Sequence, residues 1–506
     1  MFKNTFLVSI CIFISGVLGF VAQIVFASFF GASLEMDIYF KILSVPTIVT
    51  GISATIFSSV LIPTLANLKS NQLQINKFID SIWIYILFFC FLFILIGFLV
   101  SFTTIDQFVP KSAPHLRQLG IQVSLMVWIG SGFAVMSGYL SAILHYKKSF
   151  FEVAWTSLLP ALFMITIVLV FHKELGIRSI SVGFCIAFFL QFIILLKASK
   201  ISFKFSSLNI QKIPFKKKLI KQSVLVTFSL LPFTIIAPVA FFWAAQLETG
   251  SISYLGYSQS FAGFLSVAVS MGISIVLLPE LSDKFANGLE ESTLPQFEQS
   301  LRYVLLITMI AAGVLITLRI PILSFFYERG SFDTKSINSL SSVLPWYLFA
   351  AVFISGLNLL RTFFYSRGEF KNPAILGLII PMIFFVLAGV LKEEFSFVGI
   401  GIAYAVSLAI LFFITVYLAQ NKEVDFLAGG FLFFFLKNAL NVLIVSLFVT
   451  LALPLISNIT SSFILMTSCL FLFLVAYILL SKFVFKLKEI EEIKLILMSK
   501  LKISNK

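Results

Sequence analysis

The chain has 506 residues, of which 59% are hydrophobic and only 11% are charged, and its mean hydropathy is +1.06. Soluble globular proteins are about a quarter charged and less than half apolar, so this composition excludes a soluble protein and indicates an integral membrane protein. The net charge is +14 at pH 7. Because the lysines lie beside apolar segments, the charge favours contact with anionic membrane lipids over nucleic-acid binding.

Apolar segments long enough to cross a bilayer recur along the whole chain. A spanning helix needs about 20 such residues, and residues 81–101 contain no charge. Strand barrels would show short alternating segments, which do not occur, so the spans are predicted to be α-helices. The first span is interpreted as retained, since no small-residue cleavage site follows it. In chain order the predicted spans are 5–30, 38–66, 78–103, 119–145, 150–171, 176–197, 219–246, 252–282, 299–326, 337–365, 372–391, 396–419, 431–455 and 460–484.

Loop charges predict which side of the membrane each loop faces. The lysine-rich set comprises the loops around Lys69 and Lys147, the connector 197–221 with eight lysines, and the tail 482–506. The alternate loops carry fewer positive charges, and two of them carry none. Cytoplasmic loops carry an excess of lysine and arginine, so this set and both termini are expected inside. The tail from Lys488 to Leu501 has apolar residues at helical spacing and predicts an interfacial helix, with a solvated tail as the alternative.

Two pairs of similar helix endings indicate an internal repeat. SVLIPTL (59–65) resembles IVLLPEL (275–281), and YLSAILHYKK (139–148) resembles NLLRTFFYSR (358–367), with offsets of 216 and 219 residues. Matching order and offset predict a six-span unit used twice in the same orientation, although chance similarity of apolar helix ends is the alternative. The predicted divisions are an N-lobe (1–197), a basic cytoplasmic connector (198–218), a C-lobe (219–419), two extra spans (420–484) and a basic amphipathic tail (485–506).

The sequence contains no constellation of catalytic, metal-binding or nucleotide-binding residues. Three histidines stand isolated at span ends, four cysteines lie in apolar segments without redox or metal spacing, and no GxxxxGK[ST] loop occurs. We therefore expect no enzyme activity, no cofactor and no metal. Two parallel six-span lobes instead predict a transporter that works by alternating access.

Polar side chains inside spans are the candidate functional residues, because each is costly in a bilayer. Six are predicted to contact substrate: Gln23, Asp37, Lys41, Gln259, Asn358 and Arg361. Structural roles stay open for them. Gln23 could bond between helices, Asp37 and Lys41 are four residues apart and could pair, and Arg361 could extend to the cytoplasmic interface.

The stretch GVLGFVAQIVFASFFGASLEMDIYF (16–40) resembles the start of the MurJ/MviN lipid II flippase family, with its FGA turn and the aspartate that opens span two. LLPELS (277–282), ERGSFD (328–333) and FFYSRGEFKNP (363–373) are similar to the family as well. The resemblance covers spans 1–12. It implies the all-α fold of the multidrug, oligosaccharidyl-lipid and polysaccharide exporters, with 14 transmembrane helices in two pseudo-symmetric six-helix lobes plus two C-terminal helices.

The resemblance also implies a cluster of cavity arginines that engage pyrophosphate, and here the chain departs from the family. At the matching places stand Gly16, Ala22, Gly51 and Ser260, and Ala54 replaces an acidic residue. Two family lysines fall at Ser44 and Asn358, each with a cation one turn away, Lys41 and Arg361. We therefore expect these two cations to supply charge for the phosphates, and Asp37, Gln23 and Gln259 to bind sugar or gate the outer mouth.

The function implied is a flippase of the bacterial cytoplasmic membrane that moves an undecaprenyl-pyrophosphate-linked glycan, lipid II or a related polysaccharide precursor, to the outer leaflet. It would act as a monomer, with the coupling ion left open. Two alternatives are an ion-coupled multidrug-type exporter, for which Asp37 is the candidate coupling acid, and a non-transporting scaffold of a polysaccharide-assembly complex.

Overall fold

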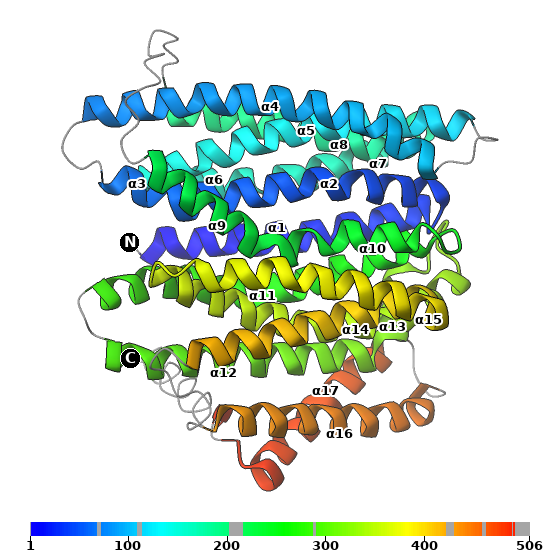
Figure 1. Cartoon of the computed structure of the whole chain (residues 1–506). Coiled ribbons are helices and arrows are strands. Elements are labelled where there is room, and N and C mark those ends of the chain that lie inside the picture. Colours follow the sequence, from blue (N-terminus) through cyan, green and yellow to red (C-terminus); the bar gives the residue numbers. More distant parts are fainter. Residues whose placement is uncertain are drawn as a thin grey trace. The chain divides into compact units, whose positions relative to one another are not determined.

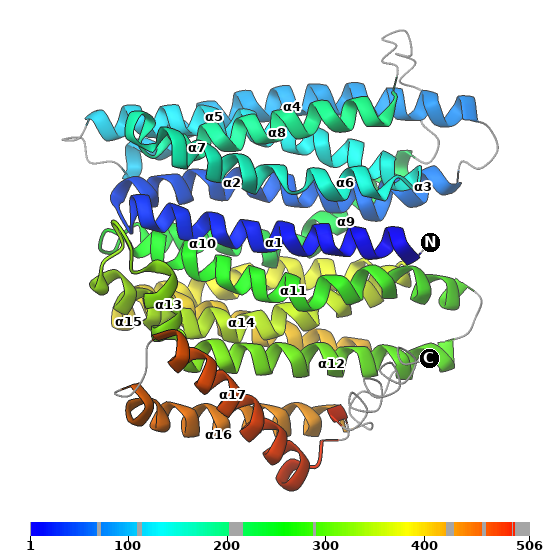
Figure 2. The same cartoon turned by 180° about the vertical axis from the view of Figure 1, so that it is seen from behind.

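The computed structural model describes residues 2–67, 72–108, 114–201, 216–286, 290–420, 430–457, 462–487 and 489–490, and these residues form helices and short connections without any strand (Figures 1 and 2). The predicted all-α membrane fold is thereby confirmed. The helices are α1 (Phe2–Phe30), α2 (Leu34–Ile56), α3 (Ile62–Asn67), α4 (Gln72–Phe108), α5 (Pro114–Tyr146), α6 (Phe150–Thr156), α7 (Leu159–Leu175), α8 (Arg178–Ser199), α9 (Lys216–Thr234), α10 (Ile236–Ala244), α11 (Ser251–Ala286), α12 (Glu290–Thr317), α13 (Arg319–Tyr327), α14 (Thr334–Ser366), α15 (Lys371–Gln420), α16 (Phe431–Ser457) and α17 (Ser462–Leu480).

Among the described residues, 12 helical segments are long and apolar enough to cross a membrane. One of them, α15, has 50 residues and is broken at Ser396, where φ is 52° and ψ is −137°. A straight helix of that length would measure about 75 Å against a bilayer core of about 30 Å, so α15 represents two crossings. The 36-residue α11 adds another. The described helices thus account for the predicted fourteen spans.

Several spans consist of two helical pieces, and proline explains one of the interruptions. Helix α9 ends at Thr234 and α10 begins at Ile236. Pro238 lacks an N–H and its ring would clash with the carbonyl of the residue four positions earlier, which is Thr234. Span two is interrupted differently, by a π-helical turn at Phe57–Leu61 between α2 and α3.

The chain forms two compact units. The first comprises Met1–Tyr257, Gly330–Phe332 and Phe370–Ile400, and the second comprises Ser258–Arg329, Asp333–Glu369 and Gly401–Lys506. These units are defined by contacts, whereas the predicted lobes were defined by the repeat. The lobe boundaries at 197 and 219 stay a prediction, and connector residues 202–215 and tail residues 491–506 lie outside the described part of the chain.

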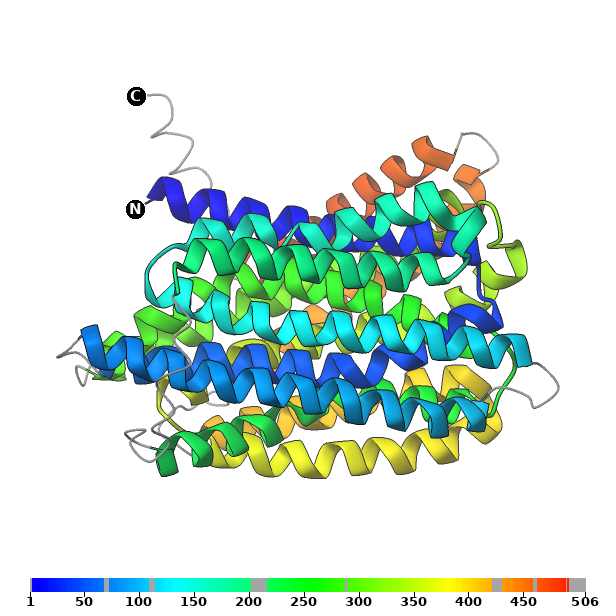
Figure 3. The same cartoon turned by 90° about the horizontal axis from the view of Figure 1, so that it is seen from above.

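In the first unit, α5 packs between α4 and α8, and α4 and α5 run side by side (Figure 3). Glycines permit this close packing, because a Cβ at Gly130 would lie 2.7 Å from the ring of Phe184. The buried Tyr139 donates a hydrogen bond to the Ile79 carbonyl, at 2.7 Å, and stacks on Trp83. Trp83 also stacks on Phe192 of span six, so aromatic contacts link spans three, four and six.

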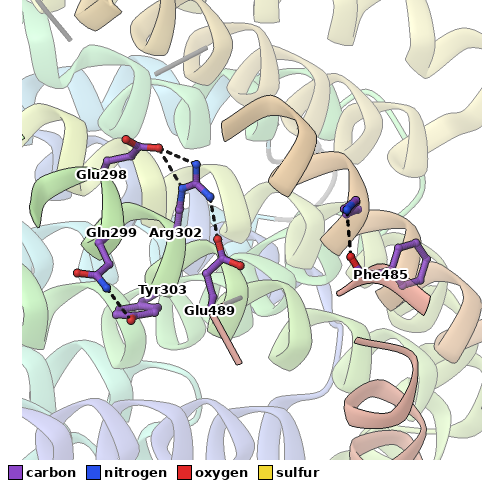
Figure 4. A network of polar contacts seen from close by, with 7 residues as sticks. Glu298, Gln299, Arg302, Tyr303, Phe485 and Glu489 are labelled. Carbon is purple, nitrogen blue, oxygen red and sulfur yellow. Dashed lines mark hydrogen bonds and ion pairs between the residues drawn. The ribbon is translucent and has the colours of Figure 1, made fainter. Parts of the chain in front are cut away.

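In the second unit, α14 is the most buried span and packs against α12, which also contacts α16. The N-terminal half of α12 carries a charged network (Figure 4), in which Arg302 donates to Glu298 at 2.7 Å and to Glu489 at 2.8 Å. Lys437 donates to the Phe485 carbonyl at 3.0 Å. These contacts fix the residues that follow span fourteen against spans nine and thirteen.

Candidate functional site

The start of span two positions the first pair of predicted residues. Ser33 is the N-cap of α2, since its hydroxyl accepts a hydrogen bond from the Met36 amide at 3.3 Å. Asp37 follows in the first turn, where a negative charge is favoured by the helix dipole. Lys41 lies one turn later. The predicted shared face is confirmed, because both side chains line one cavity and their charges interact.

Asp37, a residue that is 5% exposed, caps the N-terminus of a different helix with its carboxylate. Its Oδ2 accepts from the Gly250 amide at 2.7 Å, and its Oδ1 accepts from the Ser253 amide at 2.7 Å and from the Ser253 hydroxyl. Amides in the first turn of a helix have no intrahelical partner, so this carboxylate satisfies groups of α11 that would otherwise be orphaned. Asp37 therefore joins spans two and eight within the first unit.

The turn before α2 completes this junction. Tyr257, fully buried on α11, donates its hydroxyl to the Gly31 carbonyl at 2.9 Å. Gly250 has φ of +94°, and a Cβ there would lie 2.9 Å from the Ala32 carbonyl oxygen. The FGA turn and the start of α11 are thus in direct backbone contact, which only glycine permits.

A cavity of about 430 Å³ opens beside the pair, within the first unit. Spans two, three, four and seven contribute mainly apolar side chains to it, and its polar wall residues include Asp37, Lys41, Ser44, Ser101, Glu248 and Thr249. In the wall of this cavity, Trp128 donates its indole N–H to Ser101 at 2.9 Å. A largely apolar space of this size, lined also by one ammonium, two carboxylates and a few hydroxyls, can hold an amphiphilic molecule that bears a polar head.

Gln23 lies half-buried in the middle of α1. Its Oε1 is buried and has no hydrogen-bond partner among the described residues. A buried amide oxygen of this kind costs free energy unless a ligand or water satisfies it, which keeps Gln23 as a candidate for substrate contact.

The other three candidates belong to the second unit. Arg361 donates to Asn358 Oδ1 at 3.0 Å, so the predicted neighbourhood of these two residues on one face of α14 is confirmed. Gln259 is half-buried on α11. The six residues therefore fall into two groups of three, one in each unit, and their joint role in one site stays a prediction.

Two features of the site were not predicted. Gly250 and Ser253, the partners of Asp37, were missed, although a glycine and a serine that flank a helix start are a recognisable N-terminal signal. The docking of ERGSFD on the FGA turn was also missed. Ser331 donates its amide to the Ser28 carbonyl at 2.9 Å and its hydroxyl to the Phe29 carbonyl at 3.1 Å.

The arrangement offers groups that can bind a charged or polar molecule. Among the described residues, no group of three or more His, Cys, Asp or Glu side chains could hold a metal ion. The site contains the cation of Lys41 near Asp37, whose carboxylate is hydrogen-bonded to the start of α11. Such groups can hold or exclude a charged head group and can be rearranged when helices move.

Comparison with known proteins agrees with this description. A family model described as "Lipid II flippase MurJ" matches residues 26–474. The probable lipid II flippase MurJ of Buchnera aphidicola subsp. Baizongia pistaciae is 24% identical over 357 residues, covering 68% of this chain and 69% of that protein. The lipid II flippase MurJ of Thermosipho africanus is 24% identical over 356 residues, covering 69% and 71%.

Solved structures show the same fold. The lipid II flippase MurJ in an inward closed conformation matches with a TM-score of 0.78 and 22% identity, covering 95% of this chain and 99% of that one. A multidrug resistance MATE family transporter in an inward-facing conformation matches with a TM-score of 0.62 and 14% identity, covering 81% and 96%. At such identities these likenesses establish the fold alone. The family model, in contrast, covers most of the chain, from span one into span fourteen, and the chain therefore belongs to the lipid II flippase MurJ family.

Proposed function

We propose that this chain is a flippase that moves lipid II, or a closely related undecaprenyl-pyrophosphate-linked glycan, from the inner to the outer leaflet of the bacterial cytoplasmic membrane. It does so by alternating access and serves peptidoglycan or cell-surface polysaccharide synthesis. The observation that carries the proposal is the family match over residues 26–474. The chain is a transporter and not an enzyme.

Lys41 and Arg361 supply the positive charge for the substrate's phosphates. A pyrophosphate carries about two negative charges, and in a low-dielectric cavity each compensating cation contributes several kcal/mol. Arg361 is oriented by Asn358, which accepts one of its N–H groups at 3.0 Å, and a planar guanidinium matches the geometry of phosphate oxygens. Lys41 offers an ammonium in the wall of the cavity beside α2.

The polar, uncharged candidates act on the sugar. The buried Gln23 Oε1 is available as an acceptor for a glycan hydroxyl, and Gln259 is a second amide at a half-buried position. Asp37 gates the outer mouth through its bonds to Gly250 and Ser253, because separating spans two and eight breaks them.

The membrane arrangement belongs to the same proposal. Both termini lie in the cytoplasm, the lysine-rich connector and tail contact anionic lipids, and the protein acts as a monomer. A coupling ion or the membrane potential drives the cycle, and no residue is assigned to it.

A reconstituted flipping assay tests the function and its cations together. Purified protein is placed in vesicles that contain lipid II or another undecaprenyl-pyrophosphate-linked glycan, and the fraction of lipid reaching the outer leaflet is followed. We expect flipping by the parent chain and at least a tenfold loss in the Lys41→Ala, Arg361→Ala double variant. The exposed Lys335→Ala is the matched control and should keep the parental rate.

Depletion in the source bacterium identifies the substrate. Accumulation of inner-leaflet lipid II with lysis would identify a peptidoglycan flippase, and accumulation of a different glycolipid in viable cells a polysaccharide exporter. If no glycolipid accumulates and the vesicles show no flipping, the proposal fails and the drug-exporter or scaffold alternative replaces it. Parental flipping by the double variant would overturn only the assignment of the two cations.

A further inference from the structure

The tripeptide Gly330–Phe332 is attached to the end of α1 by contacts that secondary structure does not require. Helix α1 ends at Phe30, so the carbonyls of its last turn need partners from elsewhere. The Ser331 amide bonds the Ser28 carbonyl at 2.9 Å, and the Ser331 hydroxyl bonds the Phe29 carbonyl at 3.1 Å. The tripeptide therefore acts as a C-terminal cap for span one.

Two glycines make this contact possible, and each belongs to one of the two partners. Both Gly330 and Gly31 have φ of +61°. A Cβ at Gly330 would lie 2.1 Å from the Ser28 carbonyl oxygen, and a Cβ at Gly31 would lie 2.5 Å from the Ser331 carbonyl oxygen. The two backbones approach so closely that neither position can carry a side chain.

Phe332 anchors the tripeptide on its apolar side. Its side chain is 1% exposed and meets the ring of Tyr257 edge-on at 5.7 Å, and Tyr257 in turn donates to the Gly31 carbonyl. Ser331, in contrast, is exposed. The tripeptide therefore lies at the surface, and the contacts that hold it include one buried ring and two hydrogen bonds.

The position of the tripeptide in the chain means that its contact with α1 affects movement during transport. By its contacts it belongs to the first unit, together with α1, while the residues on either side of it, Arg329 and Asp333, belong to the second. Alternating access requires halves of a transporter to move against each other. The tripeptide lies in the predicted C-lobe (219–419) and caps span one of the predicted N-lobe (1–197), so it must either come away from span one or limit the movement of these lobes.

We propose that Gly330–Phe332 is a detachable latch on the end of span one, closed in this structure and released once in each transport cycle. The cyclic release rests on the proposed function, whereas the closed latch does not. Release frees the last carbonyls of α1 and uncovers Tyr257, so that span one can tilt. Closure restores the two hydrogen bonds and reburies Phe332.

Hydrogen exchange tests the closed latch in the purified full-length protein. The Gly330→Ala and Gly31→Ala variants should speed exchange of the Ser331 amide at least tenfold. Gly176→Ala is the matched control, because Gly176 has a similar φ of +56° but nothing lies within 4 Å of its Cβ position. Unchanged exchange in Gly330→Ala, or equal acceleration in Gly176→Ala, would overturn the latch. If Gly31→Ala does not fold, Gly330→Ala on the surface segment decides alone.

A reversible cross-link tests the release. Ser28→Cys and Ser331→Cys are introduced together after the four native cysteines have been replaced by alanine, and mass spectrometry verifies disulfide formation. The oxidised protein should flip lipid II at less than one tenth of the reduced rate, and reductant should restore the rate. Full flipping by fully cross-linked protein would show that the latch need not open. If the reduced protein does not flip either, the proposed function fails, and the exchange experiment still decides the latch.

Discussion

The carboxylate of Asp37 serves a helix start that lies 213 residues further along the chain. Each hydrogen bond to a charged acceptor contributes about 1.5–3 kcal/mol, and a buried donor that loses its partner costs a similar amount. Asp37→Ala should therefore lower the free energy of unfolding by more than about 2 kcal/mol. Ser253→Ala removes only the hydroxyl donor and should cost about 1 kcal/mol.

Unfolding in detergent, followed by circular dichroism, measures both variants. We expect the free energy of unfolding to decrease in the order parent, Ser253→Ala, Asp37→Asn and Asp37→Ala. Asparagine keeps one acceptor oxygen but places an N–H donor against the amides. If Asp37→Ala unfolds like the parent and still abolishes flipping, Asp37 contacts the substrate and does not stabilise the start of α11.

Asp333 gives a pH-dependent contribution at another helix start. Its carboxylate accepts a hydrogen bond from the Ser336 amide at 2.8 Å, and its hydrogen bonds to Ser336 lower the pKa of the carboxyl below the usual 3.8. Since the pKa is lowered in the folded state, the stabilisation is present above about pH 4 and is lost as the pH falls through the lower pKa. An N-cap of this kind contributes about 1 kcal/mol.

We therefore expect Asp333→Ala to lower the unfolding temperature at pH 6 and the difference to shrink below pH 4. Thermal unfolding of parent and variant across this range checks the prediction. A difference that stays constant down to pH 3 would mean that the variant acts by another route than the charged cap.

The distance along the chain between interacting residues decides which of these features could be predicted from the sequence. The caps at Ser33 and Asp333 lie directly before helices and follow local rules. Lys41 could be grouped with Asp37 because four residues make one helical turn. Asp37 and its partner Gly250 are more than 200 residues apart along the chain, and so are Phe29 and Ser331. A local sequence pattern cannot predict such pairings.

At the scale of elements, a buried polar network joins spans thirteen and fourteen. Tyr477 on α17 donates to Asn438 Oδ1 on α16, and the Asn438 amide reaches the sulfur of Met309 on α12 at 3.1 Å. Asn441 on α16 donates to the Ser481 hydroxyl at 2.7 Å. Polar bonds between helices replace the hydrophobic driving force that is absent in lipid, and each contributes about 0.6–2 kcal/mol.

Tyr477→Phe should therefore destabilise the second unit by about 1 kcal/mol, because Asn438 loses its donor in a buried site. Tyr417→Phe is the control, since Tyr417 is 57% exposed. Thermal unfolding in detergent compares the two. Equal unfolding temperatures would indicate that packing alone holds spans thirteen and fourteen.

Spans are the elements that hydropathy predicts well, since about 20 apolar residues are required wherever a helix crosses. Pro238 accounts for the break in span seven, which the structure places between Thr234 and Ile236. The π-helical turn in span two was not predictable from composition, because Phe57–Leu61 is as apolar as its surroundings. The network around Asn438 was not predictable either, because the periodicity of one helix does not show which other helix packs against it.

At the scale of the whole molecule, the orientation of the chain in the membrane is a prediction that rests on charge alone. The loop at Lys147 belongs to the lysine-rich set, and the loop at Lys392 and Glu393 belongs to the opposite one. The positive-inside rule therefore places Lys147 in the cytoplasm and Glu393 outside. Both positions are accessible, since Lys147 is exposed and 73% of the Glu393 side chain is exposed.

Single cysteines at these two positions test the orientation. After removal of the four native cysteines, a membrane-impermeant maleimide applied to intact spheroplasts should label Glu393→Cys and leave Lys147→Cys unlabelled until the membrane is permeabilised. The reverse pattern would place both termini outside and would invert the direction of the proposed transport. Labelling of both positions in intact cells would mean that the charge bias is too weak to fix one orientation. Only the first pattern puts the FGA turn, the start of α11 and the Gly330–Phe332 latch at the outer mouth, where a flippase must open to release its lipid.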